Sequence, residues 1–481
     1  MPGFGGRIGA TLHLPAQRGK RAVAVVAVLV LAVAAGTGVG LGAPVLVRQL
    51  AAAGAGPAIA PPPAPVVPQP ALRPAAVDGP VPTSSGVGAV LEPLAGGLGT
   101  LSGQVVDPAT GTVLWQREPG TPVVPGSTAK LLTSAAALLV LDHQARLHTT
   151  VLAGGEPGTV VLVGGGDPTL SAADVGTETV YPGAARLDDL VGQVRAAARG
   201  PVLRVLVDVH RYTGDSLAPG WLPADVAGGY IAPIVPVMLD GARADPTQEV
   251  SPRSAKPATA AAAELARRLG VDPETVATGS APPGAAVLGE VSSPPIEDLV
   301  ATVLSRSDNV LAEALAREVA RATGVQPSFS GATQAVLTVL RDHGFDVSRA
   351  TLMDGSGLSV QDAVPAALLT DLLSAAAAPD RSNADETQPR TAALRPMLVG
   401  LPVAGSNGTL ADRYDGPTAG GRGWVRAKTG TLTGVNSLAG TVLDSEGRVL
   451  VFALLSNGPN PVSARPQLDA LAAQLRSCGC R

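Results

Sequence analysis

Cysteine is nearly absent from this chain, and the two that occur, Cys478 and Cys480, stand at its C-terminal end. Their position excludes a disulfide framework for the rest of the protein. A Cys-Gly-Cys tail can instead close a tight disulfide or pin the terminus. Because a structural zinc site needs four ligands and no others lie nearby, the tail predicts no metal.

Histidine is also scarce, with five residues in 481: His13, His143, His148, His210 and His343. None stands in a pattern typical of a Ser-His-Asp triad or of a His-Glu-x-x-His zinc site. Any serine chemistry in this chain must therefore use a base other than histidine.

Aromatic residues make up 2% of the chain, and the formal net charge is -4. The core must then be aliphatic. No basic block with interleaved aromatic residues occurs, which excludes nucleic acid as the expected partner.

The N-terminus carries a basic flank followed by an uncharged apolar stretch, Ala22 to Val47. This pattern predicts a secretory signal or a membrane anchor over residues 1–48, and both remain open. Residues 49–86 are rich in alanine and proline, a composition typical of a stiff extended tether. The protein is therefore expected outside the cytoplasm, either secreted or held at the membrane by this segment.

A serine and a lysine stand three positions apart at the predicted start of a helix. Pro125 and Gly126 end a loop, and the run Leu131–Leu139 favours a helix. Ser127 and Lys130 then share one face, where the amine can reach the hydroxyl. The free N–H groups of the first helical turn can stabilise a negatively charged serine oxygen. Ser-x-x-Lys alone is common, so later motifs decide its meaning.

Two further motifs occupy plausible positions. Ser307 and Asn309 lie at the joint between a predicted helix, 296–306, and a second helix that continues after it. Lys428, Thr429, Gly430 and Thr431 lie on a predicted strand, 425–432. Two more strands follow, which predicts three antiparallel strands near the C-terminus. Other expected elements are a hairpin of 101–106 and 112–116, strands at 149–153, 159–163 and 202–209, and helices at 258–269 and 466–475.

Together, Ser-x-x-Lys, Ser-x-Asn and Lys-Thr-Gly in this order are specific. The chain resembles the penicillin-recognising serine hydrolases, and most closely the D-alanyl-D-alanine carboxypeptidase/endopeptidase family of low-molecular-mass, class C penicillin-binding proteins. The resemblance extends from about Val87 to the C-terminus, and its blocks are 125–130, 163–170, 307–309, 354–359 and 428–432.

The resemblance implies a peptidase that acts on peptidoglycan stem peptides, is acylated by β-lactams and needs no cofactor. Ser127 is the implied nucleophile and Lys130 its base, with a pKa lowered by a nearby positive charge such as Lys428. Ser307 relays the proton to the leaving amine, and Asn309 holds Lys130 and the substrate amide. Lys428 and Thr429 face the terminal carboxylate of the substrate.

The remaining implied roles belong to the backbone of the Lys-Thr-Gly strand. The N–H groups of Ser127 and Thr431 form the oxyanion hole, and Gly430 permits the close backbone approach. In this family an arginine often follows the Gly-Leu-Ser loop, where this chain has Val360. Recognition of a charged substrate side chain by that position is therefore not expected.

The spacing of the motifs predicts the domain organisation. Ser127 and Ser307 lie farther apart than the same motifs do in a class A β-lactamase. The expected fold is α/β (α+β), with a transpeptidase-like antiparallel sheet flanked by helices at 87–150 and 286–481, and an inserted accessory domain at 151–285. Two alternatives remain, a β-lactamase or esterase on this fold and a non-catalytic wall-binding scaffold. The sequence does not separate carboxypeptidase from endopeptidase activity.

Overall fold

The computed structural model describes residues 79–379, 387–458 and 461–480. They belong to one compact unit, Arg73–Arg481. The predicted signal or anchor and the predicted tether up to residue 78 lie outside the described residues. Within the described ranges, no helix combines the length and apolar character that crossing a membrane requires.

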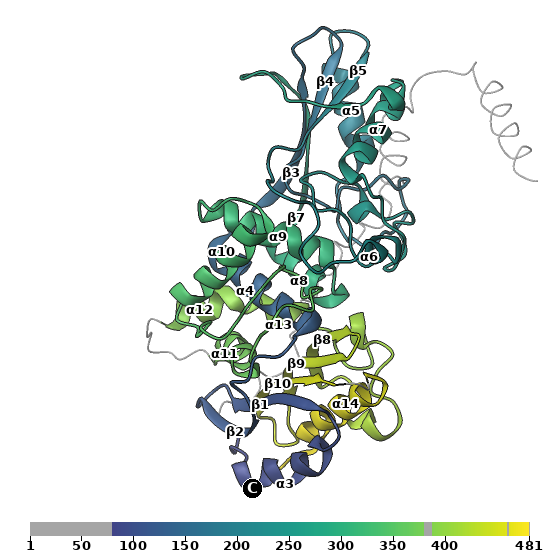
Figure 1. Ribbon diagram of the computed structural model, residues 1–481. Coiled ribbons are helices and arrows are strands. Elements are labelled where there is room, and N and C mark those ends of the chain that lie inside the picture. The colour runs from purple at the N-terminus through teal and green to yellow at the C-terminus, as the bar shows by residue number, and fades with distance from the viewer. Residues whose placement is uncertain (1–78, 380–386, 459–460, 481) are drawn as a thin grey trace, which may run out of the picture. The chain divides into compact units, whose positions relative to one another are not determined.

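The first sheet is antiparallel and joins the two ends of the described chain, in the order β2-β1-β10-β9-β8 (Figure 1). The predicted hairpin and the three predicted C-terminal strands are both confirmed. This order leaves β8, the strand with the Lys-Thr-Gly motif, at one edge. The strands are β1 (Thr100–Asp107), β2 (Thr112–Arg117), β8 (Val425–Leu432), β9 (Val435–Leu443) and β10 (Val449–Asn457).

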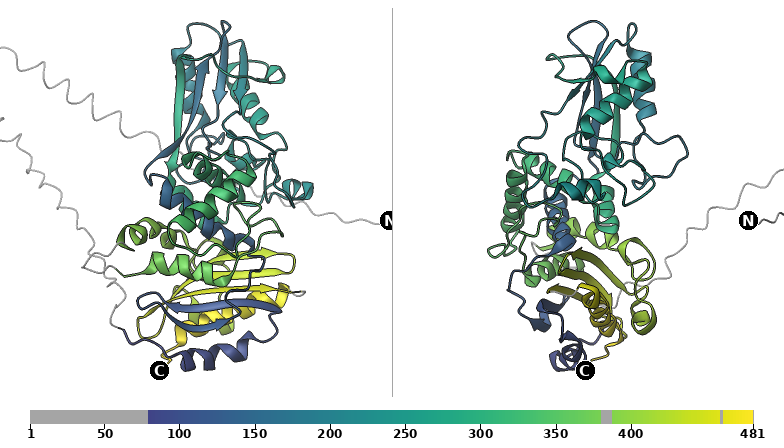
Figure 2. Two further views of the ribbon diagram at one scale, coloured as in Figure 1. Left: turned by 60° about the vertical axis from the view of Figure 1, so that its left-hand side comes forward. Right: turned by 45° about the vertical axis from the view of Figure 1, so that its right-hand side comes forward.

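Both faces of this sheet are covered, which explains the nearly continuous apolar run of β10. Alternate residues from Leu450 to Leu454 pack into a core with α3 (Ser84–Ala95) and α14 (Pro461–Ser477). The intervening residues from Val451 to Leu455 pack into the core of the central helices. Figure 2 shows helices on both sides of these strands.

The helix after Ser127, α4 (Lys130–Val140), is buried along its whole length up to Leu138. A helix that is apolar all round must lie inside a helical cluster. It packs against α8, α9 and α10, and the predicted helix at 296–306 is confirmed as α8. The other helices here are α8 (Ile296–Arg306), α9 (Asn309–Ala322), α10 (Phe329–Asp342), α11 (Ala366–Ala377), α12 (Thr387–Leu394) and α13 (Pro396–Gly400).

A second sheet with its own apolar core contains strands in the order β6-β5-β4-β3-β7. Its pairs β3–β4 and β3–β7 are antiparallel, and β4–β5 and β5–β6 are parallel. The predicted insert, 151–285, begins inside β3 and ends just before β7. The elements are β3 (Arg146–Ala153), β4 (Thr159–Val163), α5 (Leu187–Ala197), β5 (Arg204–Asp208), α6 (Pro223–Ala227), α7 (Pro257–Leu269), β6 (Ala277–Thr278) and β7 (Val287–Pro295).

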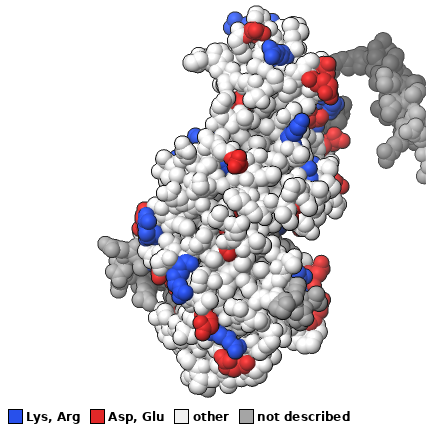
Figure 3. Space-filling model, viewed as in Figure 1, with Lys and Arg blue, Asp and Glu red and all other residues white. Residues whose placement is uncertain are grey.

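The C-terminal tail lies against the start of α3. Cys478 and Cys480 are joined as a disulfide. The N–H of Thr83 donates to the Cys480 carbonyl at 2.6 Å. On the face drawn in Figure 3, basic and acidic side chains lie interspersed in small groups on a largely uncharged surface.

Candidate functional site

Ser127 lies in a short 3-10 turn, η1 (Gly126–Ala129), that leads directly into α4. The expected helix start is confirmed, with this turn as its first residues. Gly126 has a φ of 53°, in the left-handed region where glycine is favoured. A Cβ on Gly126 would lie 3.3 Å from the backbone nitrogen of Thr431. The turn before Ser127 therefore packs directly on the backbone of β8.

The ammonium group of Lys130 uses all three of its donors inside the protein. It donates to Ser127 Oγ at 3.0 Å, to Asn309 Oδ1 at 2.5 Å and to the Ser356 carbonyl at 2.7 Å. The side chain is fully buried. Three distant segments thus fix the lysine nitrogen against the serine oxygen.

Burial lowers the pKa of Lys130 from 10.5 to about 8, while the carboxylates of Asp354 and Glu313 oppose the shift. The predicted direction is therefore confirmed. The predicted cause is not: removal of the amine from water, rather than a neighbouring Lys428, is the largest contribution.

Ser307 is the hinge residue between α8 and α9, with a φ of 58°. Asp308 caps α9, and its Oδ1 accepts from the N–H of Leu311 at 2.8 Å. Asn309 begins α9, where its amide nitrogen donates to the Tyr230 carbonyl at 2.9 Å. The Asn309 side chain therefore points towards Lys130, and the Ser307 side chain points towards Lys428.

Lys428 is buried on the edge strand β8 and donates to Ser307 Oγ at 2.8 Å and to the Thr429 carbonyl at 2.7 Å. Burial lowers its pKa well below the ordinary value, and the positive charges of Lys130 and Arg413 add to the effect. Each lysine therefore donates a hydrogen bond to one candidate serine hydroxyl: Lys130 to Ser127, and Lys428 to Ser307.

Half of the outer edge of β8 is covered. The segment 402–404 pairs with it, because the Ala404 N–H donates to the Val425 carbonyl at 2.9 Å and the Ala427 N–H donates to the Pro402 carbonyl at 3.0 Å. Outward-facing groups recur every second residue. Thr429 and Thr431 therefore point their backbone N–H groups to the same outer side, beyond the covered part.

Gly430 brings β8 against the serine turn. A Cβ at this position would lie 2.6 Å from the Pro125 carbonyl and 3.0 Å from the backbone nitrogen of Ser127. The backbone nitrogens of Ser127 and Thr431 therefore both lie where the serine turn and β8 make their close contact at Gly430. Thr429 Oγ1 donates to Thr409 Oγ1 at 2.8 Å, whereas Thr431 is exposed.

The structure thus brings all eight predicted site residues together, and it adds buried carboxylates that sequence reasoning missed. Asp354 accepts from the N–H groups of Ser356, Gly357 and Ser359 at 2.6–3.0 Å. Glu313, one turn beyond Asn309 in α9, accepts from Gly355 N–H at 3.0 Å. Burial raises the pKa of Glu313 to about 8.

These carboxylates hold the loop whose Ser356 carbonyl accepts from Lys130. The Asp-Gly-Ser-Gly spacing was a sequence signal for a tight turn, but it did not indicate what the aspartate would bind. Trp221, from the chain between β5 and α6, donates Nε1–H to Asp354 Oδ2 at 2.7 Å. No sequence signal connected Trp221 to this loop.

The polar groups around Ser127 fit acyl transfer. A serine oxygen lies beside an amine of lowered pKa, and the backbone nitrogen of Ser127 lies close to Gly430 of β8. A second hydroxyl, on Ser307, lies beside another lysine and can pass a proton. Among the residues that the structure describes, no three His, Cys, Asp or Glu side chains are grouped to hold a metal ion.

Comparisons with known proteins agree with this arrangement. The chain is 49% identical over 423 residues to the carboxypeptidase DacB of Mycolicibacterium smegmatis, covering 86% of this chain and 89% of that protein. It is 48% identical over 413 residues to a carboxypeptidase of Mycobacterium tuberculosis, covering 85% and 87%. The crystal structure of penicillin-binding protein 4 from Haemophilus influenzae matches with a TM-score of 0.64 at 20% identity, covering 82% of this chain and 98% of that chain.

The structural match shows that the fold is the mixed α/β fold predicted from the motifs. The model of the D-Ala-D-Ala carboxypeptidase 3 (S13) family matches residues 94–249 and 241–477. These segments span most of the chain and contain every candidate site residue. The chain therefore belongs to the D-Ala-D-Ala carboxypeptidase 3 (S13) family of serine peptidases.

Proposed function

We propose that this protein hydrolyses the D-Ala-D-Ala bond of peptidoglycan stem peptides through an ester on Ser127. The contact that carries this proposal is the 3.0 Å hydrogen bond between Lys130 Nζ and Ser127 Oγ. Lys130 in its neutral form takes the hydroxyl proton as Ser127 attacks the penultimate D-Ala carbonyl. The N–H groups of Ser127 and Thr431 stabilise the oxyanion, each worth about 3 kcal/mol.

Collapse of the tetrahedral intermediate needs a proton for the leaving amine. Ser307, whose hydroxyl accepts a hydrogen bond from Lys428 at 2.8 Å, relays the proton that Lys130 took from Ser127 to the departing D-Ala, so that Lys130 is neutral again. Asn309 keeps Lys130 in place through its Oδ1. Water then attacks the Ser127 ester, with Lys130 again as the base, and releases the shortened peptide.

We assign the carboxylate end of the substrate to Lys428 and Thr429. Lys428 is a buried amine, and an incoming carboxylate would favour its charged form and offset the cost of burying that charge. The hydroxyl of Thr429 lies on the same strand and already bonds a second hydroxyl, that of Thr409. The extended substrate would pair with the uncovered part of β8 beyond 425–427.

β-Lactams are expected to acylate the same serine and form a slowly hydrolysed ester. Support comes from the structure of Haemophilus influenzae penicillin-binding protein 4 in complex with a β-lactam, which matches with a TM-score of 0.58 at 20% identity and covers 81% of this chain and 98% of that chain. The site residues needed for acylation lie together in this chain. The substrate and the inhibitor therefore share Ser127.

We further infer that residues 87–150 and 286–481 form the catalytic domain and 151–285 an accessory domain. The two sheets with separate cores support a division into two domains, and the second sheet extends past these limits at both junctions, through β3 and β7. Residues 1–48 would direct the chain out of the cytoplasm, as a cleaved signal or as an anchor, and residues 49–86 would act as the tether. Their charge and composition support this placement.

The test compares the full-length chain, purified in mild detergent, with two serine variants. Ser127→Ala removes the nucleophile, and Ser134→Ala removes a buried hydroxyl farther along α4 that has no hydrogen-bond partner among the described residues. Labelling by a fluorescent penicillin and release of D-Ala from diacetyl-Lys-D-Ala-D-Ala are measured on the same samples.

We expect both activities in the wild type and in Ser134→Ala, and neither in Ser127→Ala. Rapid hydrolysis of the penicillin without a lasting adduct would favour a β-lactamase. Folded wild-type protein that neither labels nor releases D-Ala would favour a scaffold. Cleavage of a cross-linked dimeric peptide, measured in parallel, would separate endopeptidase from carboxypeptidase activity.

A further inference from the structure

The backbone conformation of the Ser307–Asn309 turn depends on contacts from outside the turn. Ser307 has a φ of 58°, a left-handed conformation that is uncommon for a residue other than glycine. Such a conformation persists where the surrounding structure enforces it. The contacts that could enforce it come from two segments that carry none of the three catalytic motifs, the chain between β4 and α5 and the chain between β5 and α7.

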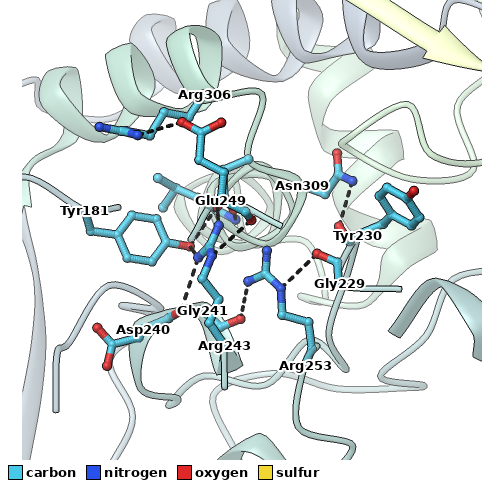
Figure 4. Close-up of polar contacts among 12 residues, drawn as sticks. Tyr181, Gly229, Tyr230, Asp240, Gly241, Arg243, Glu249, Arg253, Arg306 and Asn309 are labelled. Carbon is cyan, nitrogen blue, oxygen red and sulfur yellow. Dashed lines mark hydrogen bonds and ion pairs between the residues drawn. The ribbon is translucent and has the colours of Figure 1, made fainter. Parts of the chain in front are cut away.

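Arg243 binds the middle residue of the turn. Its Nη2 donates to Asp308 Oδ2 at 2.7 Å, and the two side chains are 4% and 1% exposed. Tyr181 completes the contact, because its hydroxyl donates to the same Asp308 oxygen at 2.9 Å. The Tyr181 hydroxyl also accepts from Arg243 Nη1 at 2.8 Å (Figure 4). Asp308 Oδ1 remains free to cap α9.

Arg253 supports the end of the turn that carries Asn309. Its Nε donates to the Gly229 carbonyl at 3.0 Å, and its Nη1 donates to the Gly241 carbonyl at 2.5 Å. Gly229 precedes Tyr230, whose carbonyl accepts from Asn309 (Figure 4). Arg243 and Arg253 also face each other in an isolated antiparallel bridge. From a single backbone pair, Arg243 thus contacts the middle of the turn directly, and Arg253 supports its Asn309 end through the Gly229–Tyr230 segment.

We propose that Arg243 and Arg253 are positioning residues for catalysis, which fix the directions of the Ser307 hydroxyl and the Asn309 amide. This inference rests on the proposed roles of Ser307 and Asn309. Arginine suits the task because its planar fork reaches several acceptors at fixed angles, which a lysine at the same place would not do. The accessory region is therefore required for the chemical step and not only for substrate binding.

A purely structural role predicts a different result. A buried ion pair that only joins two segments contributes stability, and its loss leaves the rate constants of the folded fraction unchanged. Arg211 and Glu318 form a partly buried ion pair, at 2.5 Å, between the chain that follows β5 and α9. Glu318 lies more than two helical turns beyond Asn309, so this pair serves as the matched control.

The experiment measures acylation of the full-length protein by a fluorescent penicillin and turnover of diacetyl-Lys-D-Ala-D-Ala. Arg243→Gln is compared with Arg211→Gln, each with its melting temperature. We expect Arg243→Gln to lower the acylation rate constant and kcat by about 10- to 100-fold, with KM nearly unchanged, since a small misplacement of reacting groups has this effect. Arg211→Gln should melt earlier but keep the wild-type rate constants.

Tyr181→Phe provides a second variant if Arg243→Gln does not fold. It removes one hydroxyl from the Asp308 contact and should lower kcat several-fold while KM is kept. Folded Arg243→Gln or Tyr181→Phe protein with wild-type kcat would overturn the inference. Equal losses of kcat in Arg243→Gln and Arg211→Gln would do the same. A wild-type protein without acylation would instead contradict the proposed function, so the two failures are distinguishable.

Discussion

The pH dependence of Ser127 acylation should report the burial of Lys130, because only the neutral amine can take the serine proton. Burial lowers the pKa of this lysine from 10.5 to about 8. At pH 7, an amine of pKa 8 is neutral in about 9% of molecules, and an ordinary lysine is neutral in about 0.03%. Burial therefore raises the population of the base about 300-fold at neutral pH.

The second-order rate constant for acylation by a fluorescent penicillin is the quantity to measure, from pH 6 to pH 10. We expect it to rise about 10-fold between pH 7 and pH 9 and then to level off, as the neutral fraction of Lys130 saturates. Circular dichroism at each pH controls for unfolding. A rate constant that is flat between pH 6 and pH 9, or that is still rising steeply at pH 10, would refute the reasoning.

Glu313→Gln tests the cause of this profile. The Glu313 carboxylate raises the pKa of Lys130, so its removal should move the midpoint of the profile to lower pH, with the largest effect at and above pH 8, where Glu313 is ionised. Glutamine keeps an oxygen that can accept from the Gly355 N–H. The control is Glu318→Gln, which replaces a buried carboxylate farther along α9 and should leave the midpoint of the profile unchanged. A midpoint that moves to higher pH in Glu313→Gln would contradict the assignment.

Three further changes have expected outcomes. Lys130→Met should abolish acylation, and its stability relative to the wild type should be about 3 kcal/mol more favourable at pH 7 than at pH 11 in urea unfolding. Because the pKa of Lys130 is lower in the folded state, this gain is full below pH 8 and disappears as the pH rises from about 8 to 10.5. Gly430→Ala should lower acylation at least about 100-fold, since its Cβ would lie 2.1 Å from Ser437 Oγ and 3.0 Å from Ser127 N. Trp221→Phe should destabilise the protein by about 1–3 kcal/mol, measured by urea unfolding, because Asp354 loses a buried donor.

The parts of the fold that follow from local pattern could be predicted from the sequence. Alternating residues and turn signals located the hairpin β1–β2 and the strands β8, β9 and β10. The same reasoning located α8 and the joint at Ser307, because a helix pattern is broken there. The three catalytic motifs could be assigned to one site because their order is specific, although nothing local showed that they would meet.

The support of the site could not be predicted, because it consists of contacts between residues far apart in the chain. Trp221 with Asp354 and Arg243 with Asp308 join segments that no motif connects. The cause of the lowered Lys130 pKa was missed for the same reason. Desolvation depends on how many segments close over an amine, and this follows from packing rather than from the Ser-x-x-Lys spacing.

The two lysines together show how a substrate carboxylate would prepare the base. In the free site, burial and the charge of Lys130 lower the pKa of Lys428 well below its ordinary value. A carboxylate bound beside Lys428 would raise its pKa and keep it charged. The charged Lys428 would then repel the proton on Lys130 and favour the neutral amine that Ser127 needs. The positive charge expected to lower the pKa of Lys130 would thus act when a substrate with a free C-terminal carboxylate is bound. The interaction of Lys428 with that carboxylate would then both select the substrate and activate the nucleophile.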